Sequence, residues 1–540
     1  MDDTRGFLSV VLHAHLPYVK HPECEDSLEE RWLFQAMTES YIPLLEVFRN
    51  LARDGVPYRI AVSLSPPLLE MFADPLQRER YKRHLLLLAG LGEKEMERNS
   101  QDTRLRDLAR MYRDRFLDIY RLFTSDFHED LGRAWGDLAS AGNVELITSA
   151  GTHGYLPLLL TPRAIGAQVR AGLAAFRRHF HHDPQGFWLP ECAYTPEVEP
   201  FLKEGHVTYF ILETHGILFA TPRPRFGFHA PLVTPQGMLA FGRDPDCSKQ
   251  VWSADEGYPG DGAYREFYRD IGYDLPAEYL GDALPDGARV PTGFKYYRVT
   301  DRRSSQKDVY DPEAARRRAR EHAGNFLFWR NKEADHWQAA LGRKPVMVAP
   351  YDAELFGHWW YEGPLFLEEV FRLMAAQKHR VLAIAPSDYA TYYPVNQVAE
   401  PARSSWGYKG YNEVWLEGSN DWIYRHLHVC QEQMAEAAEK HRDASGLSRR
   451  ALCQATREIL LAQASDWPFI MKAGSVPDYA RRRFVSHVGR FRRLVDEVDR
   501  GAVDPVFLHE VEERDSIFSG LDLTQCWLEG GAAGVSPETS

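Results

Sequence analysis

Short apolar runs that recur along the first part of the chain are the feature that most limits how it can fold. Each run is followed by a loop rich in polar, glycine or aromatic residues. Continuous apolar runs predict strands that are buried on both faces, as in a parallel sheet. We predict seven such strands, at Phe7–Leu12, Tyr58–Leu64, Val144–Thr148, Gly186–Leu189, Val207–Leu212, Val346–Ala349 and Val381–Ala385.

Helical patterns lie between several of these runs, for example over Pro364–Gln377. Strands that alternate with helices around a buried sheet predict an α/β barrel with a distorted outline. We assign this barrel to residues 1–73 and 141–399.

Three further segments depart from the strand–helix rhythm. Residues 74–140 are charged and helix-forming, which predicts a helical insertion. Residues 230–300 are rich in Gly, Pro, Asp and Tyr, and an excursion of that length is more often functional than decorative. Amphipathic runs predict a C-terminal helical domain over 400–527, which contributes to the active-site cleft, and 528–540 has the composition of a disordered tail.

Composition excludes several classes of partner and location. The net charge of −13 argues against a nucleic-acid or anionic-membrane surface. No apolar stretch reaches the roughly 18 residues needed to span a bilayer. The six cysteines are scattered without a C-x-x-C pair, which is typical of a reduced, cytoplasmic protein without a zinc knuckle.

Carboxylates follow two of the predicted strands at the barrel edge where catalytic groups usually lie. Glu191 follows the fourth run, just after Trp188, and Asp352 follows the sixth, where His358 also lies. Glu354 is expected to brace the loop after Asp352. Two carboxylates among aromatic rings suit glycoside chemistry, in which the gap between them separates retaining from inverting enzymes. The sequence alone leaves that gap open.

Three histidines lie in the same predicted region. His13 and His15 are two apart in the first strand and so share a face, and His153 lies in a glycine-rich turn after the third strand. Imidazoles in this arrangement could bind a metal or hydrogen-bond a polar substrate, and one of them could be purely structural.

The motifs LHAHLPY, ELITSAGTHGY, GFWLPECAY, YDAELFGHWW and AQASDWPF resemble the five ordered motifs of glycoside hydrolase family 57. The segments QVWSADEGYPGDGAYREFYRDIGYD and SSWGYKGYNEVW are similar to its 1,4-α-glucan branching enzymes. The resemblance runs from about residue 7 to residue 480. It implies a (β/α)7 barrel with a helical insertion and a C-terminal helical domain. It also implies retention, an α-glucan substrate such as amylose, and neither metal nor organic cofactor.

The same resemblance implies roles for individual residues. Glu191 becomes the nucleophile that carries the glycosyl group, and Asp352 becomes the general acid/base. The implied substrate-binding residues are His13, His15, His153, Trp188, Arg265, Tyr273, His358, Trp406, Trp415, Asp466 and Trp467. We expect a monomer or a small homo-oligomer.

One departure from the family pattern concerns a mobile loop. Branching members resemble each other in a Tyr near the tip of a loop over the site, and the matching stretch Pro235–Gln250 has no Tyr, with Phe241 the nearest ring. The ratio of transfer to hydrolysis is therefore open. The alternatives are a 4-α-glucanotransferase or α-amylase-type hydrolase of the family, a metal-dependent carbohydrate deacetylase-like or mannosidase-like barrel, and a non-catalytic glucan-binding protein.

Overall fold

A curled, mostly parallel sheet forms the centre of the molecule. The computed structural model describes residues 4–253, 256–300, 306–376 and 380–528. Its strands run in the order β6-β7-β5-β4-β3-β2-β1-β8, and β9 pairs with β1. The strands are β1 (Gly6–Ala14), β2 (Ile60–Leu64), β3 (Val144–Ser149), β4 (Gly186–Trp188), β5 (Tyr209–Leu212), β6 (Leu232–Val233), β7 (Leu239–Gly242), β8 (Val346–Asp352) and β9 (Val381–Ala383).

All seven predicted runs contain a strand, and the predicted α/β class is confirmed. The prediction missed β6 and β7, which are short and lie inside the excursion over residues 230–300. These two strands form the antiparallel pair of the sheet. The last predicted strand, β9, pairs only with the first residues of β1, where Gly6 faces Val381.

Backbone hydrogen bonds near β7 and β8 draw the two sides of the sheet towards each other. The N–H of Asp244, just beyond β7, donates to the carbonyl of Val348 in β8 at 2.8 Å. The N–H of Val346 donates to the carbonyl of His229 at 2.9 Å. The sheet therefore curls into a distorted barrel, in which β7 pairs with β5 and the residue that follows β7 reaches β8.

The stretch expected to be a mobile loop, Pro235–Gln250, is regular structure instead. It contains β7 and most of helix α10 (Pro245–Trp252). Phe241 is fully buried in β7 and packs edge-on against Tyr209, with 5.7 Å between ring centroids. Phe241 is thus part of the barrel core and does not lie in a loop over the site.

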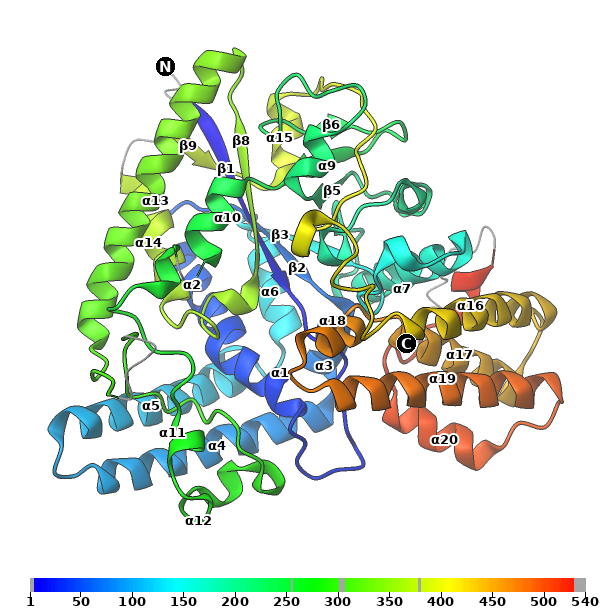
Figure 1. Ribbon diagram of the computed structural model, residues 1–540, viewed down its shortest axis with the longest axis horizontal. Helices are drawn as coiled ribbons and strands as arrows, with labels where there is room; N and C mark the ends of the chain where they lie inside the picture. The colour runs from blue at the N-terminus through cyan, green and yellow to red at the C-terminus, as the bar shows by residue number, and fades with distance from the viewer. Residues whose placement is uncertain (1–3, 254–255, 301–305, 377–379, 529–540) are drawn as a thin grey trace.

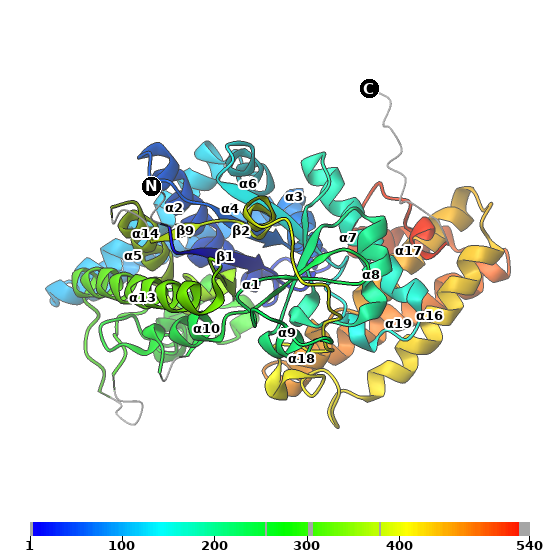
Figure 2. The same cartoon turned by 90° about the horizontal axis from the view of Figure 1, so that it is seen from above.

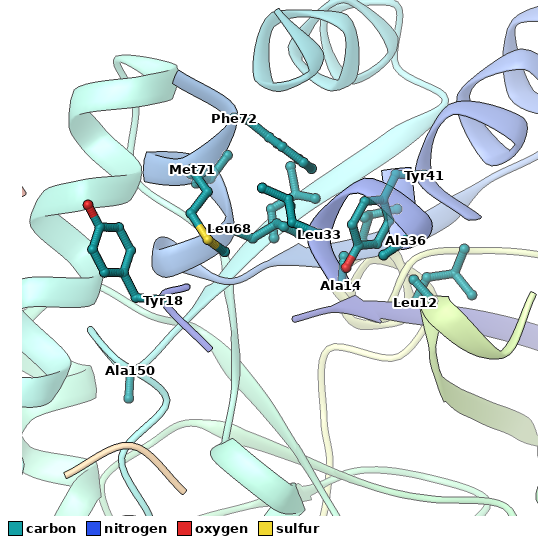
Figure 3. Close-up of a cluster of buried hydrophobic side chains, with 14 of the residues drawn as sticks. Leu12, Ala14, Tyr18, Leu33, Ala36, Tyr41, Leu68, Met71, Phe72 and Ala150 are labelled. Atoms are coloured by element: carbon teal, nitrogen blue, oxygen red, sulfur yellow. The ribbon is translucent and has the colours of Figure 1, made fainter. Parts of the chain in front are cut away.

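Helices cover the outside of the sheet. They include α2 (Ile42–Arg53), α6 (Leu131–Ser140), α7 (Pro162–Phe180), α13 (Pro312–Leu341) and α14 (Gly363–Ala376). Buried apolar side chains fill the layer between β1 and the helices α1 (Glu30–Ala36) and α3 (Pro66–Ala73). Figure 3 shows Leu12 and Ala14 of β1 beside Ala36 and Tyr41.

A helical pair projects from the barrel between β2 and β3. Its members are α4 (Pro75–Arg98) and α5 (Thr103–Arg121), and Asp74 and Asp102 cap their N-termini. The helices approach so closely that a Cβ on Gly92 would lie 2.6 Å from Arg113. In Figure 1 the pair lies at the lower left, far from the C-terminal helices at the right.

The C-terminal helices pack together beside the mouth of the barrel, at one end of the molecule (Figure 2). They are α16 (Trp422–Lys440), α17 (Gly446–Ala462), α18 (Asp466–Ala473), α19 (Pro477–Asp499) and α20 (Pro505–Arg514). The turn between α17 and α18 reaches the barrel, where Ala464 forms a β-bridge with Gly154 and the N–H of Ser465 donates to the carbonyl of His153 at 3.0 Å.

None of the described helices combines the length and apolarity needed to cross a bilayer. The six cysteines are all free thiols. The tail predicted to be disordered, 528–540, lies outside the described residues apart from Leu528.

Candidate active site

Glu191 lies three residues beyond β4 in a strained turn. Its backbone is left-handed, with φ 62° and ψ 25°, and the φ angles of Cys192 and His153 are also positive, at 48° and 56°. Such conformations are costly for residues other than glycine and cluster at functional sites. The side chain of Glu191 is only 15% exposed.

Two neutral donors hold the carboxylate of Glu191. The hydroxyl of Ser465 donates to Oε1 at 2.9 Å, and the indole N–H of Trp406 donates to Oε2 at 2.8 Å. Burial raises the pKa of Glu191, while these two hydrogen bonds oppose that rise. Both donors belong to the C-terminal part of the chain, so that part completes the site.

Asp352 ends β8 and has the opposite environment. None of the described residues donates a hydrogen bond to its carboxyl group. Burial raises the pKa of Asp352 well above its ordinary value, and the charges of Glu354 and Glu191 raise it further, with Arg243 opposing. Asp352 therefore favours the protonated form, as a proton donor requires.

Glu354 holds the loop after Asp352. It accepts a hydrogen bond from the backbone N–H of His15 at 3.0 Å and another from the hydroxyl of Tyr41. Tyr41 belongs to the buried cluster of Figure 3, so Glu354 connects the loop to the core.

The three histidines lie together, as their positions in the sequence predicted. His13 and His153 are buried and their Nε2 atoms are 3.0 Å apart. Their Nδ1 atoms contact the hydroxyls of Ser63 and Ser465, at 3.0 and 2.8 Å. All four ring nitrogens thus have hydrogen-bond partners, and binding a metal here would break some of these bonds. This donor arrangement favours the hydrogen-bonding interpretation.

His15 differs from its two neighbours in charge. Its ring stacks on His153 at 3.8 Å, and its Nε2 lies 3.2 Å from the carboxylate of Asp466. Burial lowers the pKa of His13 and His153 well below the ordinary value. Burial also lowers the pKa of His15, but the charge and the hydrogen bond of Asp466 outweigh this effect, so the pKa of His15 is raised. The cluster therefore combines two neutral histidines with one that favours the cationic form.

The predicted aromatic residues differ in access. Trp406 is half-buried, lies edge-on to Trp188 at 5.2 Å and offers a ring beside Glu191. Trp188 is fully buried and stacks on His13 at 4.4 Å, so it supports the site without an open face. Trp188, which the resemblance implied to bind substrate, thus has its ring enclosed by protein.

Trp415 and Trp467 are also enclosed. Trp415 is 1% exposed and stacks on Tyr155 at 4.4 Å. A Cβ on Gly407 would lie 2.5 Å from its ring, so Trp415 supports the loop that carries Trp406. Trp467 is fully buried, and its indole N–H donates to the carbonyl of Leu461 at 2.7 Å. Both rings pack against other protein groups, although the resemblance implied that they contact the glucan.

The structure places Arg265, Tyr273 and His358 on a separate cavity of about 1180 Å³, which we call the side cavity. Arg265 pairs with Glu39 at 2.8 Å, and Nδ1 of His358 lies 2.7 Å from the other Glu39 oxygen. Tyr273 is 50% exposed. Glu191 and Asp352 do not line this cavity, so the predicted set divides into two groups.

Rings connect the two groups. Trp359 follows His358 directly, is 40% exposed and packs against Trp252 at 5.7 Å. Trp252 in turn lies 6.5 Å from Trp406. An aromatic path therefore runs from Glu191 towards the side cavity.

Sequence reasoning missed several residues of the site: Glu39, Tyr41, Ser63, Arg243, Trp252 and Ser465. Ser465 lies within the quoted segment AQASDWPF, where its place next to Asp466 could have marked it. Tyr41 and Glu39 carried no local signal, because their partners are hundreds of residues away in the chain.

Comparison with known proteins gives consistent matches along the chain. The model described as glycosyl hydrolase family 57 matches residues 9–402, and one described as the C-terminal part of 1,4-alpha-glucan branching enzyme matches residues 426–525. A 1,4-alpha-glucan branching enzyme of Thermococcus kodakarensis is 31% identical over 95% of this chain and 77% of that protein. A probable 1,4-alpha-glucan branching enzyme of Mycobacterium tuberculosis is 30% identical over 96% of this chain and 97% of its own length.

Solved structures agree in fold along nearly the whole chain. The α-amylase AmyC from Thermotoga maritima has a TM-score of 0.91 and 39% identity, covering 97% of this chain and 99% of its own. A branching enzyme of this family type from Pyrococcus horikoshii has a TM-score of 0.88 and 32% identity, covering 99% and 98%. The chain therefore belongs to glycoside hydrolase family 57.

Proposed function

We propose that this chain is a retaining 1,4-α-glucan branching enzyme that works through a glycosyl-enzyme on Glu191. The observation that carries the proposal is the contrast between the two carboxyl groups. Glu191 has two hydrogen-bond donors that favour its ionised form, while Asp352 accepts from none of the described residues and lies near the negative charges of Glu354 and Glu191. A nucleophile and a general acid need these opposite states.

The first chemical step breaks the α-1,4 bond. A carboxylate oxygen of Glu191 attacks C1 of the sugar, the bond from C1 to the glycosidic oxygen breaks, and Asp352 gives its proton to that oxygen. In the second step ionised Asp352 takes the proton from the O6 hydroxyl of an acceptor glucan. That oxygen attacks C1, the ester bond to Glu191 breaks, and an α-1,6 branch forms.

Transfer requires that the acceptor outcompete water. Holding the acceptor near C1 raises its effective concentration, and rings suit the apolar faces of sugars. The half-buried Trp406 lies beside Glu191, and Trp252 and Trp359 continue the aromatic path. We assign the side cavity to a neighbouring segment of the glucan, since it has the volume for several sugar units and presents Tyr273.

An α-amylase-type hydrolase is the second candidate. Two observations favour it: the 39% identity to the Thermotoga maritima α-amylase, and the lack of a Tyr in Pro235–Gln250, which here forms β7 and α10. The match of residues 426–525 to the branching-enzyme C-terminal model supports branching.

Incubation with amylose tests the choice. We expect the iodine absorbance to fall with few new reducing ends, and a debranching enzyme then to release short chains. Reducing ends that rise in step with the loss of absorbance, with nothing released on debranching, would assign the chain as a hydrolase. The Glu191→Gln variant serves as the inactive control.

A further inference from the structure

Ser465 lies between the histidine cluster and Glu191. It is fully buried in the turn between α17 and α18. Its hydroxyl is 2.8 Å from Nδ1 of His153 and 2.9 Å from Oε1 of Glu191. Its backbone N–H is fixed by the carbonyl of His153 at 3.0 Å. The hydroxyl thus has one partner on each side and a fixed backbone.

The direction of every bond in this chain follows from the chemistry of its ends. An ionised carboxylate only accepts, so Ser465 gives Glu191 its single proton. Ser465 must then accept from Nδ1–H of His153, and the Nε2 of a neutral His153 is left as an acceptor. His13 therefore donates from Nε2, and its Nδ1 accepts from the hydroxyl of Ser63.

We propose that Ser465 is a positioning residue for the nucleophile: its hydroxyl orients Oε1 of Glu191 and, through the same bond chain, fixes the tautomers of His153 and His13. The inference rests on the proposed function, because it takes Glu191 as the attacking group.

The uncharged hydroxyl of Ser465 is a suitable partner for a nucleophile whose charge changes during the reaction. Glu191 loses its charge when the ester forms and regains it when the ester breaks, and Ser465 can follow both changes without a fixed counter-charge at Oε1. The other titratable groups that face or influence Glu191 are His15, His153, Tyr155, Cys192, Asp352 and Asp466.

The test compares Ser465→Ala with Ser465→Thr, using kcat/KM for amylose as a function of pH. Loss of the hydroxyl should lower kcat/KM about 10- to 100-fold, as for a hydrogen bond to a charged group. It should also move the acidic limb of the profile up by about one pH unit, because the ionised form of Glu191 loses a donor. Ser465→Thr keeps the hydroxyl and should keep the acidic limb in the wild-type position.

A control variant separates this effect from the loss of another hydroxyl that links the C-terminal helices to the barrel. Ser516 also links the C-terminal helices to the barrel, through Lys20 at 2.8 Å and Tyr18 at 3.2 Å, without contacting Glu191. Ser516→Ala should leave the pH profile unchanged. If Ser465→Ala fails to fold, Ser465→Cys keeps nearly the same volume with a weaker donor and allows the same comparison.

Two outcomes would overturn the inference: wild-type kcat/KM in Ser465→Ala, or reduced activity with the acidic limb unmoved. Glu191→Gln tells this failure apart from failure of the proposed function. An active Glu191→Gln contradicts the function itself, whereas an inactive Glu191→Gln beside a fully active Ser465→Ala contradicts only the role of Ser465.

Discussion

The catalytic centre and the side cavity hold their acidic groups in different ways. In the centre, Glu191 is held by a hydroxyl and an indole N–H, and Asp352 has no described donor. In the side cavity, Glu39 is held by the guanidinium of Arg265 and by His358. A strong ion pair keeps the carboxylate charged, which suits a residue whose role is to hold the lining of a cavity in place. Groups that exchange protons and form esters need weaker, neutral partners.

The variant with the largest expected effect replaces Glu191, the proposed nucleophile. Glu191→Gln changes the shape little but cannot form the covalent intermediate. We expect activity on amylose to fall at least several hundredfold, by roughly 3–4 kcal/mol or more, with an unchanged melting temperature. Near-wild-type turnover in the folded variant would remove Glu191 from the mechanism.

Replacing Asp352 tests its proposed role as the proton donor. Asp352→Asn should abolish cleavage of natural glucans, whose leaving group needs a proton. A substrate with a good leaving group should still react in the first step and give a burst of product in rapid-mixing measurements. An equal loss of the first step for both substrates would show that Asp352 is not the general acid.

Trp406 contributes a ring and a donor, which two variants separate. Trp406→Phe keeps a ring but removes the N–H that reaches Glu191 at 2.8 Å, so both branching and hydrolysis should fall, by about tenfold. Trp406→Ala also removes the stacking face. In this variant the ratio of new branch points to new reducing ends should fall as well, about fivefold relative to Trp406→Phe. A ratio identical in both variants would mean that the ring does not hold an acceptor.

The ion pair of Glu39 in the side cavity should make the free energy of unfolding depend on pH. Burial raises the pKa of Glu39, but Arg265 and His358 outweigh it and lower the value to about 2. Glu39 ionises more readily in the folded state, so its contribution is complete above the unfolded value, near 4.5, and is lost as the pH falls towards 2.

We therefore expect Glu39→Gln to lower the free energy of unfolding by about 2–3 kcal/mol at neutral pH, with a difference from wild type that shrinks between pH 4.5 and 2. Urea titrations at several pH values measure it. Glu46→Gln removes a carboxylate of the same cavity that is 33% exposed and serves as the control. A difference that stays constant with pH would contradict the assignment.

The smallest expected effect lies at Tyr273. If its exposed ring stacks on a glucan segment, Tyr273→Ala should raise KM for long glucans about fivefold and leave short substrates unaffected. Tyr392, 48% exposed and packed on Phe7 at the start of β1, provides a matched tyrosine away from the cavity. Equal effects of Tyr273→Ala on long and short substrates would exclude the side cavity as a glucan site.

The elements that the sequence predicted best are those with local signals. Buried parallel strands appear as apolar runs, and Glu191 and Asp352 could be found because they follow such runs directly. Strands β6 and β7 lie in the Gly- and Pro-rich excursion over residues 230–300, where the composition gave no strand signal, so they were missed.

The exposure of individual side chains and their long-range partners depend on tertiary packing, which the sequence pattern does not reveal. In the sequence, a Trp among polar residues looks the same whether its ring partly faces solvent, as in Trp406, or is enclosed, as in Trp415 and Trp467. Arg265 pairs with Glu39, which lies 226 positions earlier in the chain, and no local pattern in the sequence predicts this ion pair. Such pairings depend on the folded arrangement and leave no trace in local patterns.

The late position of Trp406, Ser465 and Asp466 in the chain has a consequence for synthesis. A ribosome completes every strand of the sheet before it has made these residues. Until they dock, Glu191 has neither of its donors and His15 lacks its carboxylate. If Glu191 is the nucleophile, we expect little activity from the nascent chain until translation has passed Asp466 and the C-terminal helices have reached the barrel.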